Sequence, residues 1–263
     1  MKACRSAAPS ASALCAAAIG MLACAAAFAE DAPSVTPYRP SVSTPAALSA
    51  PGWLELEAGV QMDRGDASVR RDSLPYTLKL AFTPDWGIRL GGEAWVRARD
   101  ETGGSVSGAG DTSVTLKRRF AIDEAHAFGL EAGATFATGH AGISGEKTAY
   151  TVNGIYSADI GDFHTDINLA ATRLGVADPG TSRTQALWAA SLSKSVNDRW
   201  GWVGELSGTH QGGAGSQSQV LGAASYNVSK TLTLDAGLAR AFGSGERRWS
   251  FFAGMTMLTG HVF

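Results

Sequence analysis

Thiols and long apolar runs are both scarce in this chain of 263 residues. Its 3 cysteines are Cys4, Cys15 and Cys24, so the chain beyond them has no disulfide framework and no thiolate metal site. One apolar stretch lies near the N-terminus, and no later run is long enough to cross a membrane as a helix. These absences exclude a disulfide-stabilised scaffold and a bundle of membrane-spanning helices.

Charge is sparse as well, because 17% of the residues are charged, against about 25% in an average globular protein. The 22 basic and 24 acidic residues give a net charge of −2. So small a net charge gives no reason to expect a nucleic-acid partner.

The N-terminal stretch has the features of an export signal. Lys2 and Arg5 precede the alanine-rich run "ASALCAAAIGMLACAAAFA", which ends in an A-x-A site at Ala29. This order predicts a secretory signal peptide over residues 1–29, cleaved after Ala29. The alternatives are a membrane-anchor helix and a lipid anchor on Cys24, but the run is short and weakly apolar and matches a lipoprotein signal poorly.

Residues 30–52 read "EDAPSVTPYRPSVSTPAALSAPG" and have no apolar period. Their richness in Pro, Ser and Ala predicts an extended or disordered periplasmic leader. We also hypothesise that this leader enters the periplasmic mouth of the domain that follows and restricts it.

From Trp53 onward the chain alternates apolar and polar residues, as in "WLELEAGVQM" at 53–62. Such a pattern fits a half-buried soluble strand or a membrane strand with an apolar outer face. About twelve such segments recur, and tight turns such as 83–86 and 159–162 alternate with generally longer loops such as 98–110. A soluble sandwich has no reason to sort its connections in this way.

Residues 53–263 are therefore predicted to form an all-β, antiparallel, up-and-down transmembrane barrel in a bacterial outer membrane. The predicted strands cover residues 53–63, 74–82, 87–97, 111–120, 127–138, 148–158, 163–173, 184–195, 201–211, 218–228, 232–242 and 249–258.

The polar face of these strands supplies the candidate functional site. Residues of both charge signs and two amides are predicted to line a narrow pore, whose charges would set solute or ion preference. The alternative is that opposite charges on adjacent strands pair and fill the interior of a structural or adhesive barrel. The predicted pore-lining residues are Glu55, Glu57, Lys79, Arg89, Glu93, Lys117, Arg119, Glu131, Asn153, Asp166, Asn168, Glu205 and Asp235.

An enzyme is the second class considered. His164, Asp166 and Asn168 share one face of a predicted strand, as a barrel-embedded lipid or ester hydrolase would require. A catalytic triad also needs a nucleophile near the base, and neither a G-x-S-x-G motif nor a suitably spaced serine identifies one. The remaining histidines lack metal-ligand spacing. We therefore expect no catalysis, no metal and no cofactor.

Membrane partners follow from two further features. The last segment, "WSFFAGMTMLTGHVF", ends on Phe263 and is similar to the terminal signal that hands bacterial barrels to their assembly machinery. The basic pairs Arg70-Arg71 and Arg247-Arg248 lie in predicted outer loops. They could contact lipopolysaccharide phosphates or remain solvated.

Three stretches of the mature chain carry a family resemblance. "YRPSVSTPAALSAPGWLELEAGVQ" (38–61), "LPYTLKLAFTPDWGIRLGGE" (74–93) and "GDTSVTLKRRF" (110–120) resemble bacterial outer-membrane transporters labelled as MetA-pathway phenol-degradation proteins. The resemblance implies a porin-like channel or transporter for passive or facilitated diffusion of small solutes, with aromatic compounds as one candidate class. It assigns no particular substrate.

Overall fold

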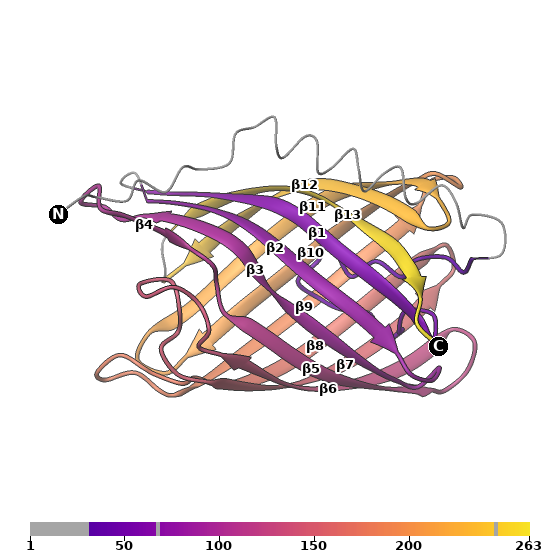
Figure 1. Cartoon of the computed structure of the whole chain (residues 1–263), viewed down its shortest axis with the longest axis horizontal. Helices are drawn as coiled ribbons and strands as arrows, with labels where there is room; N and C mark the ends of the chain where they lie inside the picture. The colour runs from indigo at the N-terminus through magenta and orange to yellow at the C-terminus, as the bar shows by residue number, and fades with distance from the viewer. Residues whose placement is uncertain (1–31, 67–68, 245–246) are drawn as a thin grey trace.

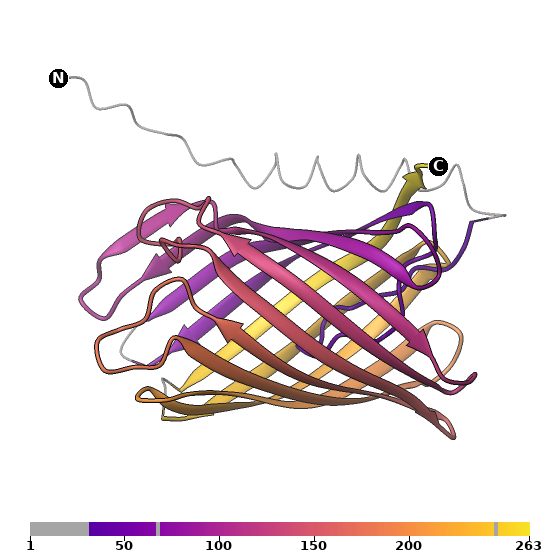
Figure 2. The same ribbon diagram turned by 90° about the horizontal axis from the view of Figure 1, so that it is seen from below.

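The chain forms a closed antiparallel β-barrel in the computed structural model, which describes residues 32–66, 69–244 and 247–263 (Figures 1 and 2). The predicted signal peptide, residues 1–29, lies outside these ranges. Twelve of the thirteen strands close the ring, since β1 pairs with both β2 and β13, and β3 pairs with β2 and β5. The predicted fold class is thus confirmed.

The strands are β1 (Trp53–Gly65), β2 (Arg70–Ala81), β3 (Trp86–Arg99), β4 (Ser105–Gly108), β5 (Thr112–Ala121), β6 (His126–Phe136), β7 (Ala149–Ile160), β8 (Phe163–Arg173), β9 (Thr184–Ser195), β10 (Trp200–Gln211), β11 (Gly215–Ser229), β12 (Leu232–Gly243) and β13 (Arg248–His261). The described ranges contain no helix with the length and hydropathy needed to cross a membrane.

One strand lies where a loop was predicted. β4 pairs only with the last residues of β3, from Val96 to Arg99, and forms a hairpin beyond the ring. Arg70 and Arg71 likewise lie within β2 and not in a loop. These strand ends lie beyond the apolar belt, so they carry no apolar alternation that a sequence pattern could detect.

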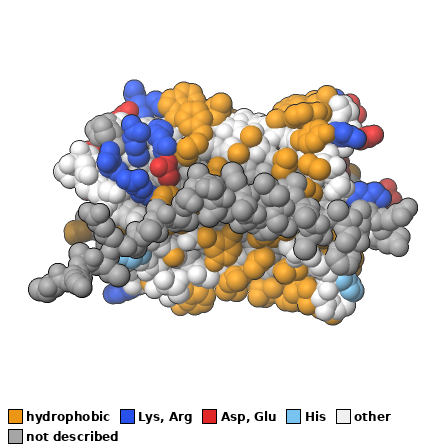
Figure 3. Space-filling view, turned by 45° about the horizontal axis from the view of Figure 1, so that its top comes forward, with side chains coloured by type: hydrophobic (Ala, Val, Ile, Leu, Met, Phe, Trp, Pro, Cys, Tyr) orange, Lys and Arg blue, Asp and Glu red, His pale blue; other side chains and the backbone are white. Residues whose placement is uncertain are grey.

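The barrel has an apolar outside and a polar inside. Leu130, Leu169 and Leu206 are about half exposed on the outer face, whereas Glu55 and Lys117 are fully buried on the inner face. Figure 3 shows hydrophobic side chains gathered along the middle of the wall. This inversion suits strands with lipid outside and polar groups within. Exposed aromatics near the tight-turn end are Phe82, Trp86, Phe120, Phe163, Trp200 and Trp202.

The leader runs inside the barrel (Figure 2). Near its start, the Val35 N–H donates to the Lys230 carbonyl oxygen at the turn between β11 and β12 (2.9 Å). It returns to the wall where Pro51 bridges Ala81, directly ahead of β1. No helix or strand is present between residues 32 and 50. The leader's described residues have irregular backbone with turns and bends, so the expected extended or disordered course of residues 30–52 stays a prediction.

Candidate functional site

The first half of the leader is held by β1 and β2. Glu55 accepts the Thr36 N–H (3.0 Å), and Glu57 accepts the Tyr38 N–H (2.6 Å). Lys79 lies directly across from Glu55 in the β1–β2 register and forms ion pairs with both carboxylates. Its ammonium also donates to the Thr36 carbonyl oxygen (2.5 Å). The two glutamates and the buried lysine together thus provide hydrogen-bond partners for the backbone of the leader at Thr36 and Tyr38.

The second half of the leader is held by the opposite wall. Glu205 on β10 accepts the N–H groups of Val42 (3.2 Å) and Ser43 (2.8 Å), and also the Ser43 hydroxyl (2.8 Å). Asn168 on β8 accepts the Thr44 N–H (2.9 Å) and donates to the Thr44 carbonyl oxygen (3.0 Å). An amide that donates and accepts with one residue replaces the two bonds that a neighbouring strand would make.

Tyr38 is the aromatic centre of these contacts. Lys79 Nζ lies 4.0 Å, Lys117 Nζ 4.3 Å and Arg89 Cζ 5.4 Å from the centroid of its ring. Its hydroxyl donates to the Ala47 carbonyl oxygen (2.6 Å) and accepts from Lys117 (3.1 Å). Three cations on one ring gain cation–π energy away from water, where this interaction is strongest.

Arg39 joins the leader to the seam between β12 and β13. Its Nε and Nη2 donate to the two carboxylate oxygens of Asp235 at 3.2 and 3.1 Å, which is the bidentate geometry. The guanidinium passes over Gly59 and Gly254, which pair across β1 and β13. A Cβ at these positions would lie 2.7 Å from Arg39 Nη2 and 2.6 Å from Arg39 Nε, respectively. Glycine is favoured there because a Cβ would also lie 2.5 Å from the Ala253 carbonyl oxygen at Gly59 and 2.6 Å from the Ala58 carbonyl oxygen at Gly254.

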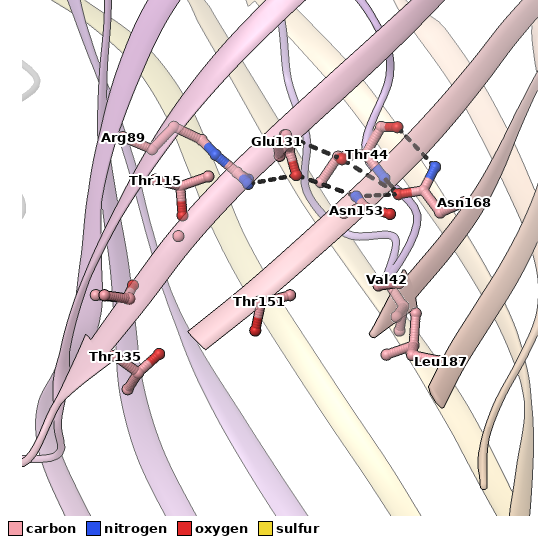
Figure 4. Close-up of a pocket in the computed structure, with 14 residues that line it drawn as sticks. Val42, Thr44, Arg89, Thr115, Glu131, Thr135, Thr151, Asn153, Asn168 and Leu187 are labelled. Atoms are coloured by element: carbon pink, nitrogen blue, oxygen red, sulfur yellow. Dashed lines mark hydrogen bonds and ion pairs between the residues drawn. The ribbon is translucent and has the colours of Figure 1, made fainter. Parts of the chain in front are cut away.

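Two cavities open beside the leader. One, of about 300 Å³, is drawn in Figure 4; a second, of about 390 Å³, shares Val42, Thr44 and Arg89 with it. In the first, Glu131 pairs with Arg89 (2.9 Å) and accepts from Asn153 (3.0 Å). Other residues lining the first cavity are Ser113, Thr115, Gly133, Ala134, Thr135, Thr151, Asn168, Ala170 and Leu187. Hydroxyls, amides and an ion pair make these cavities suitable for water and polar solutes.

The predicted pore-lining residues share the inner face of the barrel, and most of them hold the leader. Glu55, Glu57, Lys79, Lys117, Asn168, Glu205 and Asp235 contact it directly. Elsewhere, Arg71 pairs with Glu93 (2.5 Å), and Asp166 accepts the Ser157 hydroxyl (2.5 Å). Arg119, two residues along β5 from Lys117, has the same parity.

Sequence reasoning missed the roles of Tyr38 and Arg39, although both begin the stretch at 38–61 that carries the family resemblance. A further signal was the pair of inward acids Glu55 and Glu57, which have the single inward lysine Lys79 beside them on β2.

The residues of the hydrolase alternative are engaged elsewhere. The Nδ1 of His164 lies 2.6 Å from an Asp159 carboxylate oxygen, and its Nε2 lies 3.2 Å from Asp166. Ser157 donates to Asp166 and accepts the Ala46 N–H (2.7 Å), so it also serves the leader. A histidine flanked by carboxylates at both ring nitrogens has no free nitrogen to activate a nucleophile. The described residues also contain no group of three or more His, Cys, Asp or Glu placed to hold a metal ion.

The chain end lies beside the start of β1. The Val262 N–H donates to the Gly52 carbonyl oxygen (2.7 Å), and Phe263 is largely exposed. The role of Phe263 in assembly stays a prediction.

Comparisons with known proteins agree with this architecture. A family model described as "Putative MetA-pathway of phenol degradation" matches residues 83–259. A search of curated proteins finds no match. An outer-membrane channel from Pseudomonas putida F1 superposes with a TM-score of 0.64 at 14% identity, covering 85% of this chain and 99% of that one.

Two further solved structures share the fold. The NanC porin has a TM-score of 0.59 at 9% identity and covers 77% of this chain and 98% of its own. The monoaromatic hydrocarbon channel CymD has a TM-score of 0.50 at 9% identity, with coverage of 81% and 90%.

Proposed function

Because the chain belongs to the MetA-pathway phenol-degradation family, we propose that it is an outer-membrane channel for the passive or facilitated diffusion of small solutes. Its apolar outer face suits lipid, and its strands satisfy one another's backbone groups around the ring. The proposal includes no catalytic step.

The observation that carries the proposal is the pair of polar cavities beside the leader (Figure 4). Their walls belong to the rigid ring, whereas one side belongs to the leader, which is joined to the inner wall mainly through side chains. The leader can therefore shift without breaking the ring of strand pairs. A lumen that combines a fixed wall with a separable inner segment suits restricted, passive passage.

Small aromatic compounds are the solute class that we favour. The cavities combine apolar side chains such as Leu187 and Phe252 with hydroxyls and Arg89, whose Nε is buried without a hydrogen-bond partner among the described residues. An aromatic ring with one polar substituent would match both kinds of wall. The family label and the monoaromatic hydrocarbon channel support the same class.

The test is the entry of solutes into proteoliposomes that contain the full protein. We expect Thr151→Trp, which fills the cavity of Figure 4 from β7, to slow the entry of small aromatic alcohols several-fold. The matched control is Val152→Trp, the next residue, whose side chain faces lipid. Equal entry with both variants, or no entry with the correctly folded wild type, would contradict the proposed channel.

A further inference from the structure

Four arginines gather on the outer wall at the ends of β1, β2 and β3. Arg64 lies directly opposite Arg70, and Arg70 lies directly opposite Arg99. Arg97, two residues before Arg99 on β3, lies directly opposite Asp72 on β2. We call these four arginines the arginine row. Like charges directly opposite each other on neighbouring strands repel and destabilise a sheet, so the row calls for an anionic partner.

A bulge keeps the row on the outside. Arg89 and Glu93 point inward on β3, and an unbroken strand would place Arg97 and Arg99 on the same inner face. The β2–β3 register shifts between Ser73 and Pro75, because three steps on β3, from Glu93 to Val96, lie opposite two steps on β2. The extra residue reverses the inward and outward faces of β3 beyond Glu93. Bulges re-aim side chains in this way. Figure 3 shows the resulting group of basic side chains at one end of the wall, next to the hydrophobic band.

The row has little compensation from the protein. Asp72 pairs with Arg64 (2.6 Å). Within the part of the chain that the structure describes, the side chains of Arg70, Arg97 and Arg99 have no hydrogen bond or ion pair, and all three are exposed. A cavity of about 180 Å³ lies among Arg70, Asp72, Arg97 and Arg99. Each guanidinium group presents two parallel N–H donors, a geometry that suits phosphate oxygens, and three such groups line this one cavity.

The position of the row indicates what kind of phosphate it meets. It lies at the barrel end opposite the C-terminus and the tight turns (Figure 1), and that end faces outward when the termini are periplasmic. Exposed apolar side chains on the same strands, Met62, Leu90 and Trp95, lie nearer the membrane centre. A ligand with phosphate groups above acyl chains would match the row and the apolar surface together.

We propose that the arginine row binds the phosphate groups of lipopolysaccharide in the outer leaflet. Arg70, Arg97 and Arg99 take the phosphates, Arg64 is shared with Asp72, and the apolar side chains below contact the acyl chains. The site lies on the outer wall and does not depend on the lumen, so it is independent of the proposed channel.

The test is the binding of purified lipopolysaccharide to the full protein in detergent, measured by native mass spectrometry. We expect Arg70→Gln/Arg97→Gln/Arg99→Gln to weaken binding on the order of a hundredfold, since each cation near an anionic lipid surface contributes several-fold. Chemically dephosphorylated lipopolysaccharide should bind wild type and the triple variant equally weakly. The matched control is Arg118→Gln, an arginine at the opposite interface that stacks on Trp86 and Phe120 (4.7 and 5.0 Å).

Two outcomes would overturn the proposal. The first is a triple variant that shows the heat-dependent gel shift of a folded barrel and still binds lipopolysaccharide as tightly as wild type. That result would show that the arginine row is merely solvated. Displacement of lipopolysaccharide by inorganic phosphate at equal concentration would assign the row to free anions instead of a lipid.

Discussion

At the scale of single residues, the lumen depends on charges that only the leader completes. Asp235 is almost fully buried, and the guanidinium that neutralises it comes from Arg39, 196 residues earlier in the chain. Removing one partner of a buried pair leaves the other charge without compensation, which costs more than the pair itself contributes. The leader and the wall thus each stabilise the other.

Replacing Arg39 tests this dependence. We expect Arg39→Met to lower the free energy of unfolding by about 2 kcal/mol, because Asp235 would keep a buried, unpaired charge. Arg39→Met/Asp235→Asn should recover much of that loss, since both charges are then absent. Guanidinium unfolding in detergent micelles measures both variants.

The matched control is Lys194→Met, which breaks an exposed pair with Asp162. It should change the free energy of unfolding by less than about 0.5 kcal/mol. Additive effects of the Arg39 and Asp235 substitutions would contradict a coupled buried pair.

At the scale of elements, a single carboxylate fastens a long outer loop to the barrel. Asp111, just ahead of β5, accepts the N–H groups of Gly139 (2.9 Å) and Gly145 (2.8 Å). Burial raises the pKa of Asp111, but hydrogen bonds from Gly145, Ser144 and Gly139 outweigh it and hold the pKa below its ordinary value of 3.8.

The sign of this shift predicts acid loosening of the loop at 137–148. A carboxyl with a lowered pKa stabilises the folded form at pH above its ordinary value, and that contribution is lost as pH falls through the lowered pKa. We expect amide exchange at Gly139 and Gly145, compared after correction for intrinsic rates, to quicken at low pH. Asp111→Asn should already exchange quickly at pH 6, and equal protection in both proteins would contradict this prediction.

Sequence patterns located the barrel well and the leader's contacts poorly, for a physical reason. Strand alternation is local, so the inner face could be read from neighbours such as Glu55 and Glu57 alone. The leader is bound through single side chains at separations of 19 residues for Tyr38–Glu57 and 196 for Arg39–Asp235, and no period marks such contacts. The bulge on β3 between Glu93 and Val96 was missed for a related reason, because one extra residue reverses a face without changing the composition.

At the scale of the whole molecule, the barrel encloses a segment that it does not need for its own strand pairing. Each ring strand has neighbours on both sides without the leader, which adds one isolated bridge at Pro51. The leader instead occupies inner-wall carboxylates that would otherwise face water in the lumen. Its removal should therefore change both the width and the charge of the passage.

Deleting residues 32–50 is the strongest test of this arrangement. The deletion removes Arg39 and uncovers Glu55, Glu57 and Glu205, so the lumen becomes wider and more acidic. We expect a larger single-channel conductance in planar bilayers and a reversal potential shifted toward cation selectivity in a KCl gradient.

Glu205→Ala in the full chain provides the graded comparison, because it releases only the contacts at Val42 and Ser43. It should give an intermediate or flickering conductance, since the leader remains attached through Glu57 and Asp235. If a deleted barrel that shows the heat-dependent gel shift conducts no better than the full chain, the leader does not limit passage. The restriction would then lie among the outer loops, one of which Asp111 fastens at Gly139 and Gly145.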